Sequence, residues 1–374
     1  MPPRSAQAVR AKLKYRTSAD QNCRAPAIIN ADSLSNRGGT GIYIRRLLQG
    51  FCSCDANVVA AVGSRLLSPS EALSFPELPG SIRKVYNENV IFPDVAASIS
   101  PSIVHLPAFS GRTPSSVPCA VTLHDLAFSR NPSWFPFLRS VYYRLHFKRV
   151  AGKADVVMVD SDSTGKEAKR LLGINVNRIR RVYLSTDSFK ADPAAFRSIF
   201  SIQDRYLLYV GTIEPRKNIQ ALLDSWEKVR RVHSDLSLVI AGRWGWGKES
   251  LRKRLLKTEG VILTGALQEN MLKSCVSGAE LLVYPSLYEG FGLPPLEAAS
   301  AGVPSVITPA SALLEIYSGI ATVAAGFDPV SITESILDSL DKDHYPETLI
   351  EFASRFSTGH MALNVLKVYE EFGR

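Results

Sequence analysis

The chain contains 374 residues, of which 45% are hydrophobic and 21% are charged. This length exceeds the usual size of one hydrophobic core, so two domains are expected. No run of eighteen apolar residues is present, which excludes a membrane-spanning helix. Five scattered cysteines and a start without an apolar segment predict reduced thiols and a cytoplasmic protein. The net charge of +9 points to an anionic partner.

The first part of the chain predicts a basic tail followed by a strand, a glycine loop and a helix. Residues 1–25 are basic and lack apolar periodicity, which is typical of a disordered tail. A strand is expected at 25–30 and a helix from residue 42, with the loop Arg37-Gly-Gly-Thr-Gly41 between them. Such a loop lets backbone approach a phosphate closely, although a plain tight turn has the same pattern. The spacing fits neither G-x-G-x-x-G nor a P-loop.

Further strands are expected at 57–64, 102–107 and from residue 119, the last one leading into His124 and Asp125. Ligands of open α/β sheets bind outside the carboxyl ends of the strands, so these two residues are candidates for chemistry. A histidine at a strand end is also often a core or loop residue. Another strand at 154–161, a helix at 163–172 and a final strand at 179–187 complete the first domain.

Residues 134–150 combine apolar and basic side chains at helical spacing. Arg139, Arg144, Lys148 and Arg149 alternate with apolar positions, as in helices that lie on a membrane surface. A surface helix that packs on its own domain gives the same pattern, and both interpretations stay open. A nucleic-acid role is disfavoured because no recognised binding module accompanies the helix.

A second series of strands and helices follows a polar stretch at 188–204. A strand ending at Gly211 leads into a loop with Arg216 and Lys217, and an amphipathic helix starts at Ile219. Strands are expected at 236–242, 261–265, 280–286, 303–308 and 320–325, with a last helix at 356–372. Alternating strands and helices predict a parallel, doubly wound sheet.

The stretch from Tyr284 to Ala298 carries the clearest signal. A buried strand ends there and is followed by Glu289, two glycines and Pro294-Pro295, where a helix is expected to begin. Glu297 falls in the first turns of that helix. Helix N-termini favour anions, so two carboxylates beside such a terminus are well placed to bind the hydroxyls of a sugar and a ribose.

Four segments resemble the retaining family 4 glycosyltransferases: "GGTGIYIRRLL", "HDLAF", "GTIEPRKN" and "YPSLYEGFGLPPLEAASAGVP". The last contains the E-x7-E pattern, and the resemblance spans roughly residues 26 to 370. It implies a GT-B fold: α/β, with two Rossmann-like doubly wound parallel-sheet domains facing a cleft and a C-terminal helix crossing back. The expected parts are the tail at 1–25, domains at 26–187 and 188–355, and the crossover helix at 356–374.

The resemblance also implies roles for individual residues. Glu297 would bind the ribose, Glu289 the transferred sugar, His124 would orient that sugar and Asp125 would place the acceptor. The diphosphate and the rest of the donor would be held by Gly39, Gly41, Gly211, Arg216, Lys217, Phe291, Gly292 and Leu293. No metal and no cofactor are expected, because no Asp-x-Asp stands in a suitable loop and the two cations neutralise the leaving group. Thr212 and the "RFSTGH" segment depart from the family's frequent residues.

The predicted function is retaining transfer of a hexose from a nucleotide-sugar donor to a glycan or lipid-linked acceptor. Motif style favours bacterial mannosyltransferases of surface-polysaccharide or lipopolysaccharide synthesis, so GDP-mannose is the first expected donor and a UDP-hexose the second. The enzyme is expected to be cytoplasmic and peripheral on the inner membrane face, with an anionic membrane as partner. Alternatives are a GT-B sugar-nucleotide epimerase and a non-catalytic bilobal sugar-binding protein.

Overall fold

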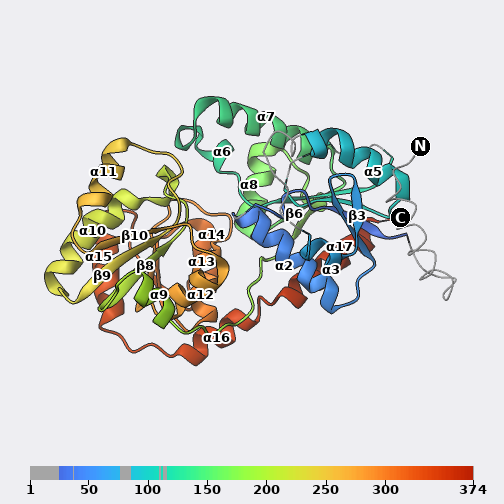
Figure 1. The fold of residues 1–374 in the computed structure, drawn as a ribbon. Helices are drawn as coiled ribbons and strands as arrows, with labels where there is room; N and C mark the ends of the chain where they lie inside the picture. Colours follow the sequence, from blue (N-terminus) through green and yellow to red (C-terminus); the bar gives the residue numbers. More distant parts are fainter. Residues whose placement is uncertain (1–24, 37, 76–85, 109–110, 113–115, 374) are drawn as a thin grey trace. The chain divides into compact units, whose positions relative to one another are not determined.

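The chain folds as two compact units in a computed structural model that describes residues 25–36, 38–75, 86–108, 111–112 and 116–373 (Figure 1). Unit 1 comprises the described residues up to 130, residues 138–185 and residues from 357 onward. Unit 2 comprises residues 131–137 and 186–356. The expected basic tail, except for its last residue, and Arg37 of the glycine loop lie outside the described residues.

Unit 1 is built on a seven-stranded sheet in the order β3-β2-β1-β4-β5-β6-β7. Neighbouring strands are parallel, except that β3 pairs antiparallel with β2. The central strands are short apolar runs buried on both faces, as a parallel sheet covered by helices requires. The strands are β1 (Ala27–Asn30), β2 (Val58–Val62), β3 (Arg65–Leu67), β4 (Val104–Leu106), β5 (Cys119–Leu123), β6 (Val156–Val159) and β7 (Ile179–Arg181).

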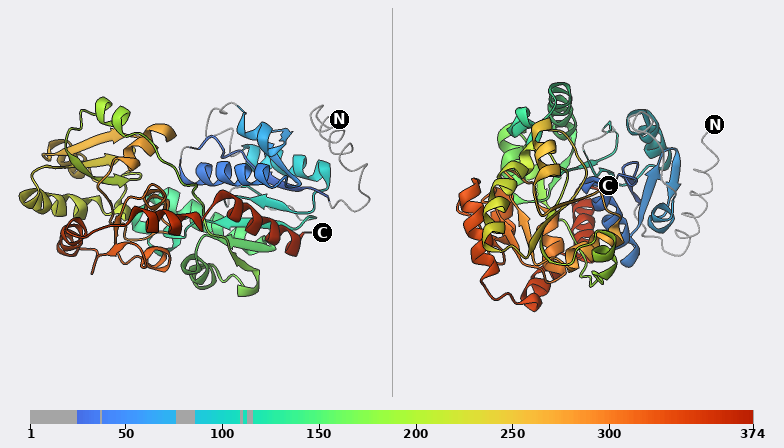
Figure 2. Two further views of the ribbon diagram at one scale, coloured as in Figure 1. Left: turned by 90° about the horizontal axis from the view of Figure 1, so that it is seen from below. Right: turned by 60° about the vertical axis from the view of Figure 1, so that its left-hand side comes forward.

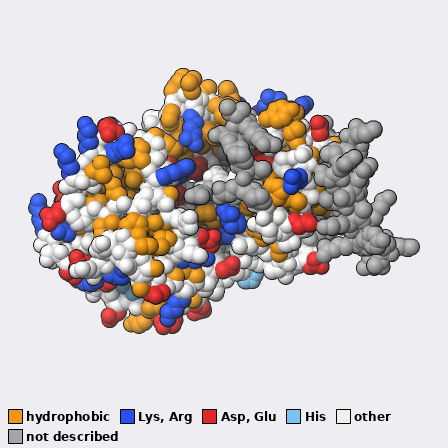
Figure 3. Space-filling view, in the orientation of Figure 1, with side chains coloured by type: hydrophobic (Ala, Val, Ile, Leu, Met, Phe, Trp, Pro, Cys, Tyr) orange, Lys and Arg blue, Asp and Glu red, His pale blue; other side chains and the backbone are white. Residues whose placement is uncertain are grey.

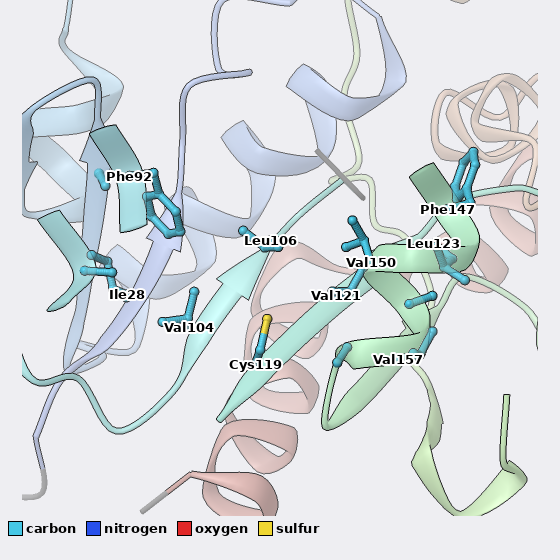
Figure 4. Packing of buried hydrophobic residues seen from close by; sticks show 14 of the residues in the cluster. Ile28, Phe92, Val104, Leu106, Cys119, Val121, Leu123, Phe147, Val150 and Val157 are labelled. Carbon is cyan, nitrogen blue, oxygen red and sulfur yellow. The ribbon is translucent and has the colours of Figure 1, made fainter. Parts of the chain in front are cut away.

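Helices cover both faces of this sheet (Figures 1 and 2). One face carries the apolar cluster drawn in Figure 4, in which α5, α7 and α8 pack on side chains from β1, β4, β5 and β6. The other face meets α2 and α17, which pack against each other. The helical segments are α2 (Gly39–Ser53), α3 (Pro69–Leu73), η1 (Asn87–Ile91), α5 (Phe92–Ile99), α6 (Ala127–Arg130), α7 (Phe137–Lys153), α8 (Asp162–Leu172), η3 (Val176–Arg178) and α17 (Thr358–Phe372).

Side chains alternate across the sheet, and this alternation places polar groups under α2 and α17. Val104 and Leu106 of β4 point into the apolar cluster (Figure 4), so His105 between them lies on the opposite face. There the buried His105 is hydrogen-bonded through Nδ1 to the hydroxyl of Tyr369 on α17, at 2.6 Å, and through Nε2 to Thr122 Oγ1 on β5, at 2.8 Å. The last helix is thus fixed to the first unit's sheet by a buried polar contact.

Unit 2 is built on a six-stranded, all-parallel sheet in the order β10-β9-β8-β11-β12-β13. Numbered from β8, this is the order 3-2-1-4-5-6 of a Rossmann sheet. The strands are β8 (Arg205–Val210), β9 (Leu236–Ala241), β10 (Val261–Gly265), β11 (Leu281–Tyr284), β12 (Ser305–Ile307) and β13 (Thr322–Val323). The helical segments are η2 (Pro132–Trp134), α9 (Ala194–Ile199), η4 (Pro215–Lys217), α10 (Ile219–Val232), α11 (Glu249–Lys257), α12 (Glu269–Ser277), α13 (Leu293–Ser300), α14 (Ser311–Tyr317), α15 (Pro329–Leu340) and α16 (Pro346–Ser354).

The expected helix over residues 134–150 is wrong at its first turn. The observed helix α7 begins at Phe137, directly after Pro136, and proline is typical of a helix start. Trp134 and Phe135 instead belong to a short segment that packs within unit 2. The first domain is therefore not the continuous span 26–187, because residues 131–137 leave it.

The close contact between α2 and α17 leaves no room for a side chain at Gly50. A Cβ atom there would lie 2.5 Å from the carbonyl oxygen of Thr358 and 2.6 Å from Cβ of Ala362. We expect Gly50→Ala to destabilise unit 1 by about 1–3 kcal/mol, because the two helices must separate. Gly152→Ala in α7 is the control, since its Cβ would meet nothing within 4 Å. Unfolding followed by circular dichroism measures both variants. Equal unfolding midpoints for Gly50→Ala and Gly152→Ala would contradict this packing.

Candidate functional site

The candidate donor site of unit 2 lies where the strand order reverses. β8 and β11 are neighbours in the sheet although they are far apart in the chain. The segment after β8 contains Gly211, Arg216 and Lys217, and the segment after β11 contains Glu289. Ligands of open α/β sheets bind at such a switch point, outside the carboxyl ends of the strands. The sheet order therefore brings both predicted segments to one place.

Lys217 and Glu289 form a buried ion pair at the centre of this place. The Lys217 ammonium donates a short hydrogen bond to Oε1 of Glu289 and a second one, of 2.7 Å, to the hydroxyl of Tyr284. Arg216 Nη1 donates to Oε2 of the same carboxylate at 3.1 Å. The side chains of Lys217 and Glu289 are both less than one-tenth exposed. Two cations thus hold one carboxylate in a site shielded from water.

A second carboxylate balances the charge of this network. The guanidinium of Arg216 pairs with Glu214, which is also buried, at 2.5 Å. Two acids and two cations make the network neutral, so Arg216 and Lys217 both have carboxylate partners within the protein. The backbone also joins the two segments, since the Leu287 amide donates to the Arg216 carbonyl at 2.8 Å. Sequence analysis missed Glu214, although it stands two residues before Arg216 in the same loop.

The cations keep Glu289 charged. Burial alone would raise the pKa of this carboxyl group, but Lys217 and Arg216 outweigh burial and lower it to about 2. Burial lowers the pKa of Lys217, and Glu289 opposes that change. The ammonium therefore depends on its carboxylate partner to stay protonated in this dry environment. We conclude that Glu289 is an acceptor of hydrogen bonds and not an acid at neutral pH.

The second E-x7-E carboxylate lies on α13, the helix expected after the double proline. Gly292 is the N-cap residue of this helix and has a left-handed backbone (φ +91°), which L side chains rarely adopt, so this position favours glycine. The Tyr317 hydroxyl donates to the Gly292 carbonyl at 2.7 Å and fixes the turn. Phe291 is buried, Leu293 begins the helix, and Glu297 is 9% exposed in its second turn.

Gly211 shapes the other side of the switch point. It has φ +150°, and a Cβ there would lie 2.8 Å from the Tyr209 hydroxyl oxygen. Its amide still donates to the Ala241 carbonyl of β9, at 2.9 Å. Glycine permits this backbone without a steric penalty. The chain then stays beside the segment after β9, where Ile213 pairs with Trp244.

In unit 1, the predicted His124 lies at the carboxyl end of β5 beside an acid that was not predicted. Asp160 follows the neighbouring strand β6, and its Oδ2 lies 2.8 Å from Nδ1 of His124. Asp160 is 1% exposed and His124 is 19% exposed at their side chains. The signal for Asp160 was available, since it is an acid directly after a buried strand. Asp125 instead accepts a hydrogen bond from the Ala127 amide, at the start of α6, at 3.1 Å.

The imidazole of His124 is also fixed by an aromatic ring. Tyr43 on α2 meets it edge-to-face at 4.8 Å between centroids, and its hydroxyl lies 3.2 Å from Thr122 Oγ1. Burial disfavours the charged imidazole, but Asp160 outweighs burial and raises the pKa of His124. Burial raises the pKa of Asp160, which His124 counteracts. The pair therefore keeps a proton on the imidazole to higher pH than a free histidine.

The two predicted glycines of unit 1 lie in the first turn of α2 and not in a loop before it. A Cβ at Gly41 would lie 1.7 Å from the Asn36 carbonyl oxygen, so that position requires glycine. A Cβ at Gly39 would meet nothing within 4 Å, which leaves the helix start uncovered on that side. Such a terminus suits an anion. Within the described part of the chain, no group of three or more His, Cys, Asp or Glu side chains is arranged to hold a metal ion.

Solved structures with similar folds establish the fold class of this protein. Anabaena HepE, in complex with UDP and glucose, superimposes with a TM-score of 0.69 at 15% identity and covers 92% of this chain and 100% of its own. Sucrose-phosphate synthase from Thermosynechococcus elongatus gives a TM-score of 0.70 at 17% identity, with 93% and 99% covered. Two parallel-sheet α/β units together with these neighbours define a GT-B fold, which confirms the predicted fold class.

Sequence comparison identifies the domain that unit 2 carries. Residues 194–356 match the family model described as "Glycosyl transferases group 1", so the chain carries a group 1 glycosyltransferase domain. O-antigen chain mannosyltransferase B of Escherichia coli is 29% identical over 263 residues, which are 67% of this chain and 69% of the relative. O-antigen chain mannosyltransferase RfbU of Salmonella typhimurium is 28% identical over 195 residues, about half of each chain.

The contact between His124 and Asp160 predicts that the pKa of His124 depends on the Asp160 carboxylate. Because the folded-state pKa of His124 is raised, its stabilising effect is present below its ordinary pKa of 6.5 and is lost as the pH rises through the raised value. We expect Asp160→Asn to lower the pKa of His124, since burial then acts without the carboxylate. NMR titration of the imidazole measures this. Asp125→Asn is the matched control and should lower the pKa less, and an unchanged pKa in Asp160→Asn would contradict the pairing.

Proposed function

We propose that this protein is a retaining glycosyltransferase that moves a hexose, mannose first among the candidates, from a nucleotide donor to a glycan or lipid-linked acceptor. The observation that carries the proposal is the buried network of Lys217, Arg216, Glu214 and Glu289 at the switch point of the group 1 domain. A site with paired charges, glycine turns and a helix start suits a ligand that contains both hydroxyls and a diphosphate.

On the donor side, the proposed roles follow from the charges. An arriving diphosphate offers Lys217 and Arg216 a second anion, which frees oxygens of Glu289 to accept hydrogen bonds from the transferred sugar. The amides at Phe291, Gly292 and Leu293 begin a helix and suit a phosphate or sugar oxygen. Glu297 binds the ribose. Because the site is shielded from water, each of these contacts is stronger than it would be in solution.

Retention follows when the acceptor hydroxyl attacks from the face that the leaving group departs. The diphosphate oxygen then takes the acceptor proton, and no separate general base is required. Lys217 and Arg216 stabilise the charge that develops on the leaving diphosphate, which is the largest contribution expected from such a site. His124, held by Asp160, orients the transferred sugar, and Asp125 helps to place the acceptor. Gly39 and Gly41 present the start of α2 to the diphosphate. No metal ion is proposed for this chemistry.

Two donors are supported by different comparisons. Relatives named as O-antigen mannosyltransferases favour mannose carried by GDP and an acceptor in lipopolysaccharide assembly. HepE, a neighbour in fold, has been solved with UDP-glucose, which makes a UDP-hexose the second candidate. The sequence relatives share 28–29% identity with this chain and HepE shares 15%, so GDP-mannose remains the first choice.

We further propose that the enzyme works at the inner face of the cytoplasmic membrane and binds it through α7. Five apolar side chains on one side of this helix face solvent, with Phe137 79% and Leu138 81% exposed: Phe137, Leu138, Val141, Tyr142 and Leu145. Four exposed cations accompany them: Arg139, Arg144, Lys148 and Arg149. We call these nine side chains the α7 surface. Figure 3 shows hydrophobic side chains gathered where Figure 1 places this helix.

The composition of the α7 surface fits an anionic bilayer. Its apolar residues extend over the first half of the helix, while Lys148 and Arg149 continue the same side toward the C-terminal end. Among the described residues, no carboxylate pairs with Arg144, Lys148 or Arg149. An interfacial helix has this arrangement of exposed apolar groups and exposed cations. No helix in the described part of the chain is long and apolar enough to cross a membrane.

The proposed reaction is tested with a panel of nucleotide sugars. We expect free nucleoside diphosphate to appear only with an acceptor, transfer to survive EDTA, and the product to keep the donor's anomeric configuration by NMR. Lys217→Met should lower kcat/KM by roughly 100- to 1000-fold, the cost of removing one group that stabilises a leaving charge. Lys228→Met, an exposed cation on α10, is the control. Nucleotide release without any acceptor, with an altered sugar as product, would instead indicate an epimerase.

Membrane binding is tested by co-sedimentation with liposomes of phosphatidylcholine alone or mixed with phosphatidylglycerol. Each cation near an anionic surface contributes about 1 kcal/mol, so the α7 surface should bind only the anionic liposomes and should release them at high salt. Changing Arg139, Arg144, Lys148 and Arg149 to glutamine should abolish binding. A control with the same charge change alters the exposed Lys228, Arg231, Lys253 and Lys257 of unit 2. If the α7 variant and the unit 2 control variant bind the liposomes equally, α7 is not the membrane-binding surface.

A further inference from the structure

A short segment from the first half of the chain belongs to unit 2, although the chain on both sides of it belongs to unit 1. Residues 131–137, which we call the strap, join α6 to α7. Asn131 caps the single turn of η2 by accepting hydrogen bonds from the amide and the hydroxyl of Ser133, at 3.3 and 2.6 Å. The strap therefore has a defined local structure and is not a plain linker.

The strap is held in unit 2 by aromatic contacts and one hydrogen bond. The indole N–H of Trp246 donates to the Trp134 carbonyl at 2.5 Å. The ring of Phe135, which is 9% exposed, lies 5.6 Å from the ring of Trp246. The ring of Trp134 lies 6.2 Å from that of Tyr288. Such pairs contribute beyond the apolar area that they bury.

The contact with Tyr288 connects the strap to the proposed donor site. Tyr288 directly precedes Glu289 and is itself buried. Its carbonyl accepts a hydrogen bond of 3.2 Å from Nη1 of Arg216, the same nitrogen that donates to Glu289. A shift of Tyr288 would therefore move both a cation and the carboxylate of the network.

We propose that the strap positions the donor-binding loop, residues 284–292, and that Trp134 is its positioning residue. This rests on the proposed function, because the loop is taken to bind the donor. Trp134 need not touch the substrate. If the loop adopts its binding conformation only part of the time, apparent affinity falls by that fraction, and the packing of Trp134 on Tyr288 keeps the fraction high. Loss of the strap contact should therefore raise the Kd of the donor, while the chemical step at saturating donor stays nearly unchanged.

Hydrogen–deuterium exchange of the full chain tests the inference without a ligand. In Trp134→Ala, amides of 284–292 should exchange roughly five times faster than in the parent, while those of β9 should not change. Trp134→Phe keeps a ring against Tyr288 and should restore slow exchange. Tyr345→Ala removes an aromatic side chain that is 69% exposed in unit 2 and is the control. Equal exchange of 284–292 in Trp134→Ala and the parent would overturn the inference.

Donor binding supplies a second measurement. Calorimetry with GDP-mannose and with UDP-glucose should show roughly a fivefold higher Kd for Trp134→Ala, the change expected when one aromatic pair is lost. At saturating donor, kcat should stay within about twofold of the parent, because the effect is on the loop population. A parent enzyme that binds neither nucleotide sugar contradicts the proposed function. A parent that binds, together with an unchanged Kd in Trp134→Ala, contradicts the role of the strap alone.

Discussion

The buried ion pair between Lys217 and Glu289 is the contact on which the organisation of the candidate donor site depends. Neither group can be buried with its charge unpaired, because the desolvation cost of a single ion is several kcal/mol. The pair therefore fixes the segment after β8 against the segment after β11. Arg216 and Glu214 extend the network, and the Leu287 amide closes it through the backbone. Two loops far apart in sequence become one rigid surface at the end of the sheet.

Unit 1 also contains a pair of charged side chains, His124 and Asp160, at the ends of neighbouring strands. Each residue follows one of two neighbouring parallel strands, so the carboxyl ends of β5 and β6 place them 2.8 Å apart. The Tyr43 ring contacts the imidazole of His124, and its hydroxyl is hydrogen-bonded to Thr122. Thr122 is in turn hydrogen-bonded to His105, which is hydrogen-bonded to Tyr369 of α17. Each unit thus holds a charged side chain beside a buried partner of opposite charge.

Much of the fold could be predicted, because the central strands are short apolar runs and helices such as α13 and α15 begin beside a proline. The E-x7-E segment likewise indicated the strand, turn and helix that are observed around Gly292. Partners across the sheet could not be predicted, since Asp160 and Glu214 meet His124 and Arg216 only through strand register and loop shape. Trp134 was assigned to a helix because apolar periodicity continued through it, whereas Pro136 marks the true start.

The measurement that tests the ion pair most directly is a double-mutant cycle on Lys217→Met and Glu289→Gln. All four tryptophans, at 134, 226, 244 and 246, lie in unit 2, so their fluorescence during urea unfolding reports on this unit. Each single variant should lose about 3–5 kcal/mol, because it leaves a buried charge with too few partners. The double variant should lose less than the sum of the two. Additive losses would show that the two side chains do not depend on each other and would contradict this account.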